Sequence, residues 1–110
     1  MARLGLPYNI CADFNMAPEE LEAIRRASVS SALALQEAMR SCRAGLGEWE
    51  LASLLTWIQA RHGADGPAYA AIVGSGPNSL VLHYNFSARR MREGEVVLID
   101  FAPEVDHFTS

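Results

Sequence analysis

Lysine is absent from this 110-residue sequence, and its nine basic residues are arginines spread along the chain. The formal net charge is −4. Binding to nucleic acid rests on clustered basic side chains that neutralise phosphates, and no such cluster occurs here. The composition therefore argues against a nucleic-acid partner.

Cysteine is scarce as well. Cys11 and Cys42 stand alone, with no CxxC spacing and no histidine beside either of them. This pattern argues against a disulfide framework and against a zinc knuckle. We expect two buried or unpaired thiols.

Long apolar runs are also missing. A membrane span needs about 18 consecutive apolar residues, and no stretch of the sequence reaches that length. Residues 1–10 carry one arginine and no sustained apolar segment, so we do not expect them to form a signal peptide. We expect no membrane association and a cytoplasmic location. Half of the residues are hydrophobic and a fifth are charged, which is an ordinary globular balance.

Two amphipathic helices are predicted in the first part of the chain. Residues 1–17 show no clean period and are interpreted as a tail or linker remnant. The first helix begins at Pro18 and stops at Gly45, with an apolar stripe at Leu21, Ile24, Ala32, Leu35, Met39 and Cys42. The second runs from about Glu48 to His62, with a stripe at Leu51, Leu54, Leu55 and Ile58. Their short connection predicts antiparallel neighbours.

The second part of the chain changes to a strand period. We expect a strand at 68–73, a tight turn at 74–78, and further strands at 80–84, 95–101 and 108–110. Glu93-Gly94 predicts another turn. The order indicates an α+β fold in which two antiparallel helices pack on one face of an antiparallel sheet.

Two side chains in this part are candidates for chemistry. Asp100 directly follows the apolar run Val96–Ile99, which predicts a strand buried on both faces. A carboxylate there needs a partner, a hydrogen bond or a metal, although a hydrated aspartate at a strand end is the commoner case. His83 stands at the end of an apolar segment, where it is either a hydrogen-bonded rim residue or a proton carrier beside a metal.

Other polar and aromatic residues favour structural roles. Adjacent residues on a strand point to opposite faces, so Asp106 and His107 cannot share one ion, and a turn is expected there. Trp49 and Trp57 fall on the second predicted helix, where we expect them to pack or to lie at an interface.

Several motifs, in this order, resemble the pita-bread (M24-type) metallopeptidases, and among them the Xaa-Pro aminopeptidase (aminopeptidase P) group. The resemblance covers residues 18–110. It rests on the first helix, with Pro18-Glu19-Glu20 and Ile24-Arg25-Arg26-Ala27, and on four later segments: Gly66-Pro67-Ala68-Tyr69, Ser75-Gly76-Pro77-Asn78, Leu82-His83-Tyr84 and Gly94–Asp100.

The resemblance implies roles for the two candidate residues. Asp100 corresponds to the first ligand of a dinuclear site that holds manganese or cobalt. His83 corresponds to a histidine that lines the substrate pocket and handles the tetrahedral intermediate. The next aspartate of the family would come directly after Ser110, and a histidine and two glutamates would come later. Residues 18–110 therefore resemble the N-terminal half of a catalytic domain, and we expect the fragment to be inactive by itself.

The implied reaction is removal of N-terminal residues from Xaa-Pro peptides, with a homodimer as a possible assembly. Three alternatives remain open: a methionine aminopeptidase, a metal-free creatinase-like hydrolase, and a non-catalytic module that binds peptides or partner proteins. The sequence departs from the family in two places. Asp100 is followed by Phe101-Ala102-Pro103 instead of Ala-Gly, and the first helix has Ala17 where a capping side chain is usual.

Overall fold

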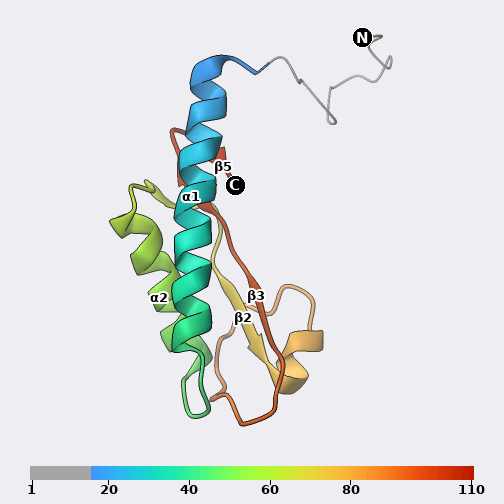
Figure 1. Ribbon diagram of the computed structural model, residues 1–110. Helices are drawn as coiled ribbons and strands as arrows, with labels where there is room; N and C mark the ends of the chain where they lie inside the picture. Colours follow the sequence, from blue (N-terminus) through green and yellow to red (C-terminus); the bar gives the residue numbers. More distant parts are fainter. Residues whose placement is uncertain (1–15) are drawn as a thin grey trace, which may run out of the picture.

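The computed structural model describes residues 16–110, in which two helices lie side by side and small antiparallel sheets pack against them (Figure 1). The helices are α1 (Pro18–Ser41) and α2 (Glu48–Arg61). The strands are β1 (Gly66–Pro67), β2 (Ile72–Ser75), β3 (Val97–Asp100), β4 (Pro103–Val105) and β5 (Phe108–Thr109), and a 3₁₀ helix, η1 (Gly76–Leu80), follows β2. The α+β class is confirmed. Residues 1–15, which make up most of the expected tail and include Cys11, lie outside the described residues.

Both helices begin and end close to the predicted positions. Pro18 opens α1, and the Glu20 carboxylate accepts a hydrogen bond from the Ala17 N–H at 2.8 Å. This bond satisfies one of the free donors at the helix start, although Ala17 has no capping side chain. Gly45 has a φ of 88°, a left-handed conformation that favours glycine, where the chain turns from α1 into α2.

The buried face of α1 differs from the predicted stripe. The residues that face the protein interior are small: Ala23, Ala27, Ser30, Ala34 and Ala38. Leu21, Leu35 and Met39 of the predicted stripe are 50%, 39% and 61% exposed. The prediction was wrong because it ranked side chains by hydrophobicity, whereas the contact with α2 selects side chains short enough for two helices to approach closely. The Ser30 hydroxyl bridges that contact by donating to the Gln59 carbonyl at 3.2 Å.

The core lies where α2 meets α1 and β2. Leu51, Leu55 and Ile58 of α2 are buried as predicted, and Leu54 is half-buried. They join Ala34 and Ala38 of α1 and two side chains from the second part of the chain, Val73 and Met91.

The strands form two separate sheets, so the prediction of a single sheet was wrong. β2 pairs with β3, with Ile72 opposite Asp100 and Ser75 opposite Val97. The other sheet has the order β1-β4-β5. β4 was not predicted, and residues 68–71 are not in a strand.

The segment after β2 also differs from the prediction. Gly74 and Ser75 belong to β2, the following residues form η1, and 81–84 form a turn where a strand was expected. The apolar segment at 80–82 has no strand partner among the described residues, and Leu80 and Leu82 are 89% and 85% exposed.

β3 is buried on one face only, which corrects the expectation of burial on both. Val97 and Ile99 are half-buried and pack against the core, whereas Leu98 and Asp100 are exposed on the opposite face. Alternate residues of a strand point to opposite faces, so Asp100 lies on the face of β3 that is turned away from the helices.

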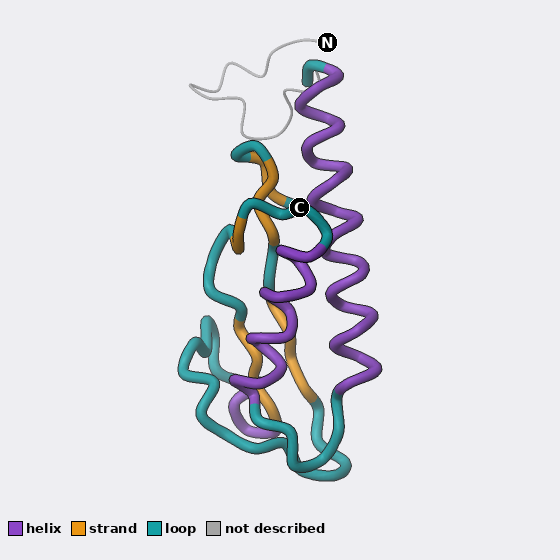
Figure 2. Tube along the Cα trace, turned by 90° about the vertical axis from the view of Figure 1, so that its left-hand side faces the viewer, coloured by secondary structure: helices purple, strands orange, loops and turns teal. Residues whose placement is uncertain are grey.

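The C-terminal hairpin of β4 and β5 lies against α1 (Figure 2). Asp106 and His107 form its turn, as predicted, and both have positive φ. Arg26 of α1 pairs with Asp106, and the Ser31 and Ser110 hydroxyl oxygens lie 2.6 Å apart. Cys42 is an exposed free thiol. Within 16–110, neither helix is long and apolar enough to cross a membrane.

Candidate metal and substrate site

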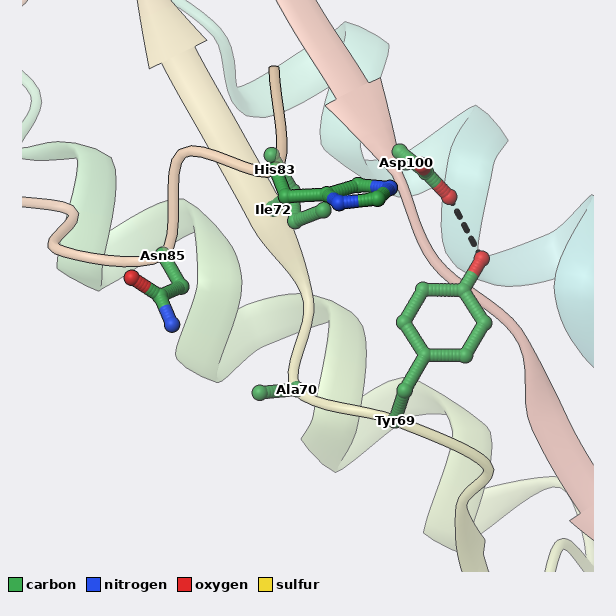
Figure 3. Close-up of a pocket in the computed structure, with 6 residues that line it drawn as sticks. All are labelled: Tyr69, Ala70, Ile72, His83, Asn85 and Asp100. Carbon is green, nitrogen blue, oxygen red and sulfur yellow. Dashed lines mark hydrogen bonds between the residues drawn. The ribbon is translucent and has the colours of Figure 1, made fainter. Parts of the chain in front are cut away.

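A pocket of about 420 Å³ lies on the face of the β2–β3 ribbon that is turned away from the helices. Figure 3 shows the six side chains that line it: Tyr69, Ala70, Ile72, His83, Asn85 and Asp100. Three segments that are distant in sequence meet there: residues 69–72, the 83–85 turn and the end of β3. The pocket therefore brings together both candidate residues of the sequence.

Asp100 is the last residue of β3 and is paired across the ribbon with Ile72. Its carboxylate accepts a hydrogen bond from the Tyr69 hydroxyl at 2.5 Å (Figure 3). The hydrogen bond to Asp100, with smaller contributions from burial and from the negative charge, raises the pKa of Tyr69 to about 12. The phenol thus stays protonated at neutral pH and remains a donor to Asp100, which has its second oxygen available for another partner.

His83 reaches the pocket by a different local structure from the predicted one. It lies in the turn after η1 and has a φ of 53°, in the left-handed region that non-glycine residues seldom adopt. Its imidazole and the Asp100 carboxylate nevertheless lie on the same side of the ribbon (Figure 3). The predicted strand was wrong, and the turn that replaces it places His83 in a pocket that Asp100 also lines.

Among the described residues, Asp100 is the pocket carboxylate that could contribute to a metal site. No group of three or more histidine, cysteine, aspartate or glutamate side chains gathers within 16–110. Asp100 is a carboxylate with an oxygen facing the pocket, the kind of ligand that suits manganese and other hard divalent ions. The donor chemistry therefore fits a divalent ion for which Asp100 is one ligand.

Tyr69 and Asn85 line the pocket but were not predicted as site residues. Tyr69 belongs to one of the segments that carry the family resemblance, and this was the one feature of the sequence that could have marked it as a site residue. Nothing in the sequence pattern singled out Asn85, because its place follows from the turn that carries His83.

Glu48 is a third residue that the sequence did not mark. The sequence pattern placed it at the start of the second predicted helix and predicted no other role for it. In the structure its side chain is fully buried and accepts hydrogen bonds from residues 75–89. Burial opposes ionisation, but these hydrogen bonds outweigh it and hold the pKa of Glu48 below its usual value.

Arg89 and Glu95 form an ion pair beside this network. Two nitrogens of the guanidinium contact both carboxylate oxygens, at 2.5 and 2.6 Å, and the same side chain donates to the Ser75 hydroxyl at 3.0 Å. The hydrogen bonds from Arg89 lower the pKa of Glu95. The pair joins the segment before β3 to the end of β2.

The chain resembles known peptidases in sequence. Residues 22–110 match metallopeptidase family M24. The Xaa-Pro aminopeptidase of Escherichia coli K12 is 44% identical over 84 residues, which are 76% of this chain and 19% of that protein. The human Xaa-Pro dipeptidase is 35% identical over 96 residues, which are 83% of this chain and 20% of that protein. The chain thus spans about a fifth of the length of these curated relatives.

Solved structures give the same result for the fold. Zinc-substituted E. coli aminopeptidase P in complex with product superposes with a TM-score of 0.83 at 40% identity, covering 86% of this chain and 22% of that one. Proline aminopeptidase P II from Yersinia pestis gives the same four values. The fold is therefore that of the corresponding part of aminopeptidase P, as the resemblance implied. Since the family match covers most of the sequence, the chain belongs to metallopeptidase family M24.

Proposed function

We propose that this chain supplies a metal ligand, Asp100, and a substrate-binding histidine, His83, to a dinuclear metallopeptidase that removes N-terminal residues from Xaa-Pro peptides. The observation that carries the proposal is the pocket in which the two side chains meet (Figure 3). Relatives named Xaa-Pro aminopeptidase and Xaa-Pro dipeptidase support the substrate class.

The spacing of the two residues is a further support. Solved variants of E. coli aminopeptidase P replace a histidine and an aspartate that are as far apart in that chain as His83 and Asp100 are in this one. A second replaced aspartate follows there at a distance that corresponds to the position directly after Ser110. Equal spacing within a shared fold favours equal roles.

The roles follow from the chemistry of each side chain. Membership of family M24 implies divalent metal ions, and we propose manganese or cobalt as the pair. When bound, such ions polarise the scissile carbonyl and provide a nucleophile at neutral pH. Asp100 would hold one ion by a carboxylate oxygen, and Tyr69 would fix the orientation of the carboxylate through its hydroxyl.

His83 acts on the substrate side of the pocket. Its imidazole can donate a hydrogen bond to a carbonyl oxygen and stabilise the charge that develops there when the bond is attacked. The adjacent Asn85 amide offers a further polar contact for the peptide backbone. The homodimer suggested by the resemblance stays a prediction.

Metal binding provides the first test. In the 110-residue chain, Mn²⁺ should broaden the NMR signals of Asp100 and Ile72 by paramagnetic relaxation, and Asp100→Asn should abolish this broadening. Glu93→Gln, at an exposed carboxylate in the turn before β3, should leave it unchanged. Broadening that survives in Asp100→Asn would refute the ligand assignment.

Activity provides the second test. We expect no hydrolysis by the 110-residue chain, because Asp100 is the one candidate ligand among its described residues. A protein extended to the length of the relatives should cleave an Xaa-Pro peptide in the presence of Mn²⁺. Asp100→Ala should remove that activity, and His83→Ala should lower kcat. Glu93→Ala should keep the full activity. Full activity in Asp100→Ala would show that the proposed function is wrong.

A further inference from the structure

Glu48 connects α2 to the segment that carries His83. It is the first residue of α2, and its side chain has no exposed surface. One carboxylate oxygen accepts hydrogen bonds from the backbone N–H and the hydroxyl of Ser75, at 2.7 and 2.8 Å, and from the Asn78 amide at 3.1 Å. The other accepts from the Tyr84 hydroxyl at 2.9 Å and from the Arg89 N–H at 3.0 Å. A single carboxylate thus holds both ends of residues 75–89.

Five hydrogen-bond donors surround the buried Glu48 carboxylate. A buried charge is costly unless hydrogen bonds compensate it, and these donors, together with the positive end of α2, provide the compensation. Nothing in the proposed chemistry at Asp100 uses Glu48, which does not line the pocket. Its burial therefore needs another explanation.

Backbone bonds also join Arg89 and Met91 to the start of α2 and the turn before it, but the middle of the segment that Glu48 holds has few other contacts. Residues 81–88 have no regular secondary structure, and His83 and Ser87 have φ values of 53° and 45°. Such conformations persist only where surrounding contacts enforce them. Leu82 and Phe86 are 85% and 78% exposed, so apolar packing within the described residues contributes little.

Tyr84 is the buried exception in this segment, at 7% exposure. Its hydroxyl donates to Glu48 and accepts a hydrogen bond from the Ala88 N–H at 3.0 Å. Tyr84 lies in sequence between His83 and Asn85, both of which line the pocket. A displacement of Tyr84 would therefore move both pocket residues.

We propose that Glu48 is a positioning residue for the candidate site, which fixes Tyr84 and thereby holds His83 and Asn85 at the pocket opposite Asp100. The functional meaning of this role rests on the proposed function, but the role itself does not require a metal or a substrate. Through Ser75, Glu48 also holds the end of β2, the strand that contributes Ile72 to the pocket.

The test is NMR spectroscopy of the labelled, metal-free 110-residue chain, in which the ring signals of His83 and the amide signals of His83 and Asn85 are followed. Glu48→Gln replaces an acceptor by an amide group whose nitrogen can only donate, and Tyr84→Phe deletes the hydroxyl. Both should shift the His83 and Asn85 signals and raise their picosecond-to-nanosecond mobility, while signals from the C-terminal half of α2 keep their positions.

Glu50→Gln is the matched control. Glu50 lies at the same end of α2 and accepts a hydrogen bond from the Gly47 N–H at 2.7 Å, but it has no bond to Ser75, Asn78 or Tyr84. It should leave the His83 ring signals unchanged. Unchanged His83 and Asn85 signals in Tyr84→Phe, or an equal change in Glu50→Gln, would overturn the proposal. If Glu48→Gln unfolds the chain, Tyr84→Phe decides the question alone.

The two proposals fail separately. A mobile His83 in Glu48→Gln, combined with Mn²⁺ broadening that persists in Asp100→Asn, would support the positioning role and refute the metal ligand. If the broadening depends on Asp100 and the His83 signals do not change in Glu48→Gln, the metal ligand is supported and the positioning role is refuted.

Discussion

The contact between the two helices and the segment between β2 and β3 are stabilised in opposite ways. The helices meet through a line of alanines, with no polar bond across the line except that of Ser30 among the described residues. The segment at 76–96 is joined to the rest of the protein by hydrogen bonds to the Glu48 carboxylate, by the bond from Arg89 to Ser75 and by backbone bonds of Arg89 and Met91. Its apolar side chains at Leu80, Leu82, Phe86 and Val96 are the most exposed large hydrophobic residues described in the chain.

This difference separates the two tasks of the molecule. Close packing of short side chains gives a rigid support that tolerates little change in volume. A loop held by directed hydrogen bonds can present an unusual backbone conformation, such as that of His83, at a defined place. The proposed site takes Asp100 from β3, whose other face packs against the core, and His83 from the hydrogen-bonded segment.

The largest effect is expected from removing a core side chain on the packed side. Leu55→Ala should lower the free energy of unfolding by about 2–5 kcal/mol, because Leu55 is fully buried and a cavity would remain. Leu80→Ala, at an exposed leucine of the hydrogen-bonded segment, should change it by less than about 0.5 kcal/mol. Urea unfolding of both variants measures the contrast, and equal losses would contradict it.

Acidification should weaken the hydrogen-bonded side. The pKa of Glu48 is lower in the folded state than its ordinary value of 4.5. Its contribution is therefore complete above pH 4.5 and is lost as the pH falls from there through the folded pKa. Glu48→Gln should cost about 1.5–3 kcal/mol at neutral pH and should flatten the loss of stability in acid.

Urea midpoints measured from neutral to acid pH provide the check. The pKa of Glu95 is lowered in the same direction, so Glu95→Gln should flatten the remaining part of the acid dependence. An acid dependence in Glu48→Gln as steep as that of the unchanged chain would mean that Glu48 is not responsible.

Adding volume to the helix contact should also destabilise the chain. Ala34 has no exposed surface, so Ala34→Leu should cost about 1–3 kcal/mol through displaced helices and strained side chains. Ala32→Leu adds the same atoms to an exposed position of the same helix. The difference between the two unfolding free energies isolates the effect of the contact, and no difference would mean that the helices are not closely packed there.

The smallest effect tests the predicted stripe of α1. Leu35→Ala should change the free energy of unfolding by less than about 0.5 kcal/mol, since Leu35 is 39% exposed and lies outside the core. Thermal unfolding beside the unchanged chain is sufficient. A loss of about 2 kcal/mol or more, typical of a buried leucine, would place Leu35 in a core and restore the predicted stripe.

Local signals in the sequence were enough for the helices and for part of the site. Pro18, Gly45 and Gly63 delimit the two helices because their backbone preferences act on neighbouring residues alone. The apolar run before Asp100 correctly predicted a strand. The segment at 80–84 is also mostly apolar, but a strand needs a partner, and no described strand pairs with this segment.

The sequence by itself determined the α+β order of elements, the resemblance to family M24 and the two candidate residues, because each rests on residues close together in the chain. Only the tertiary structure decided which face of α1 is buried, that β2 pairs with β3, and that Tyr69 donates to Asp100. It also revealed that the buried carboxylate of Glu48 connects α2 to the turn of His83 by hydrogen bonds. These features depend on contacts between residues some 25 to 40 positions apart, and no local pattern in one sequence records which distant residue will be the partner.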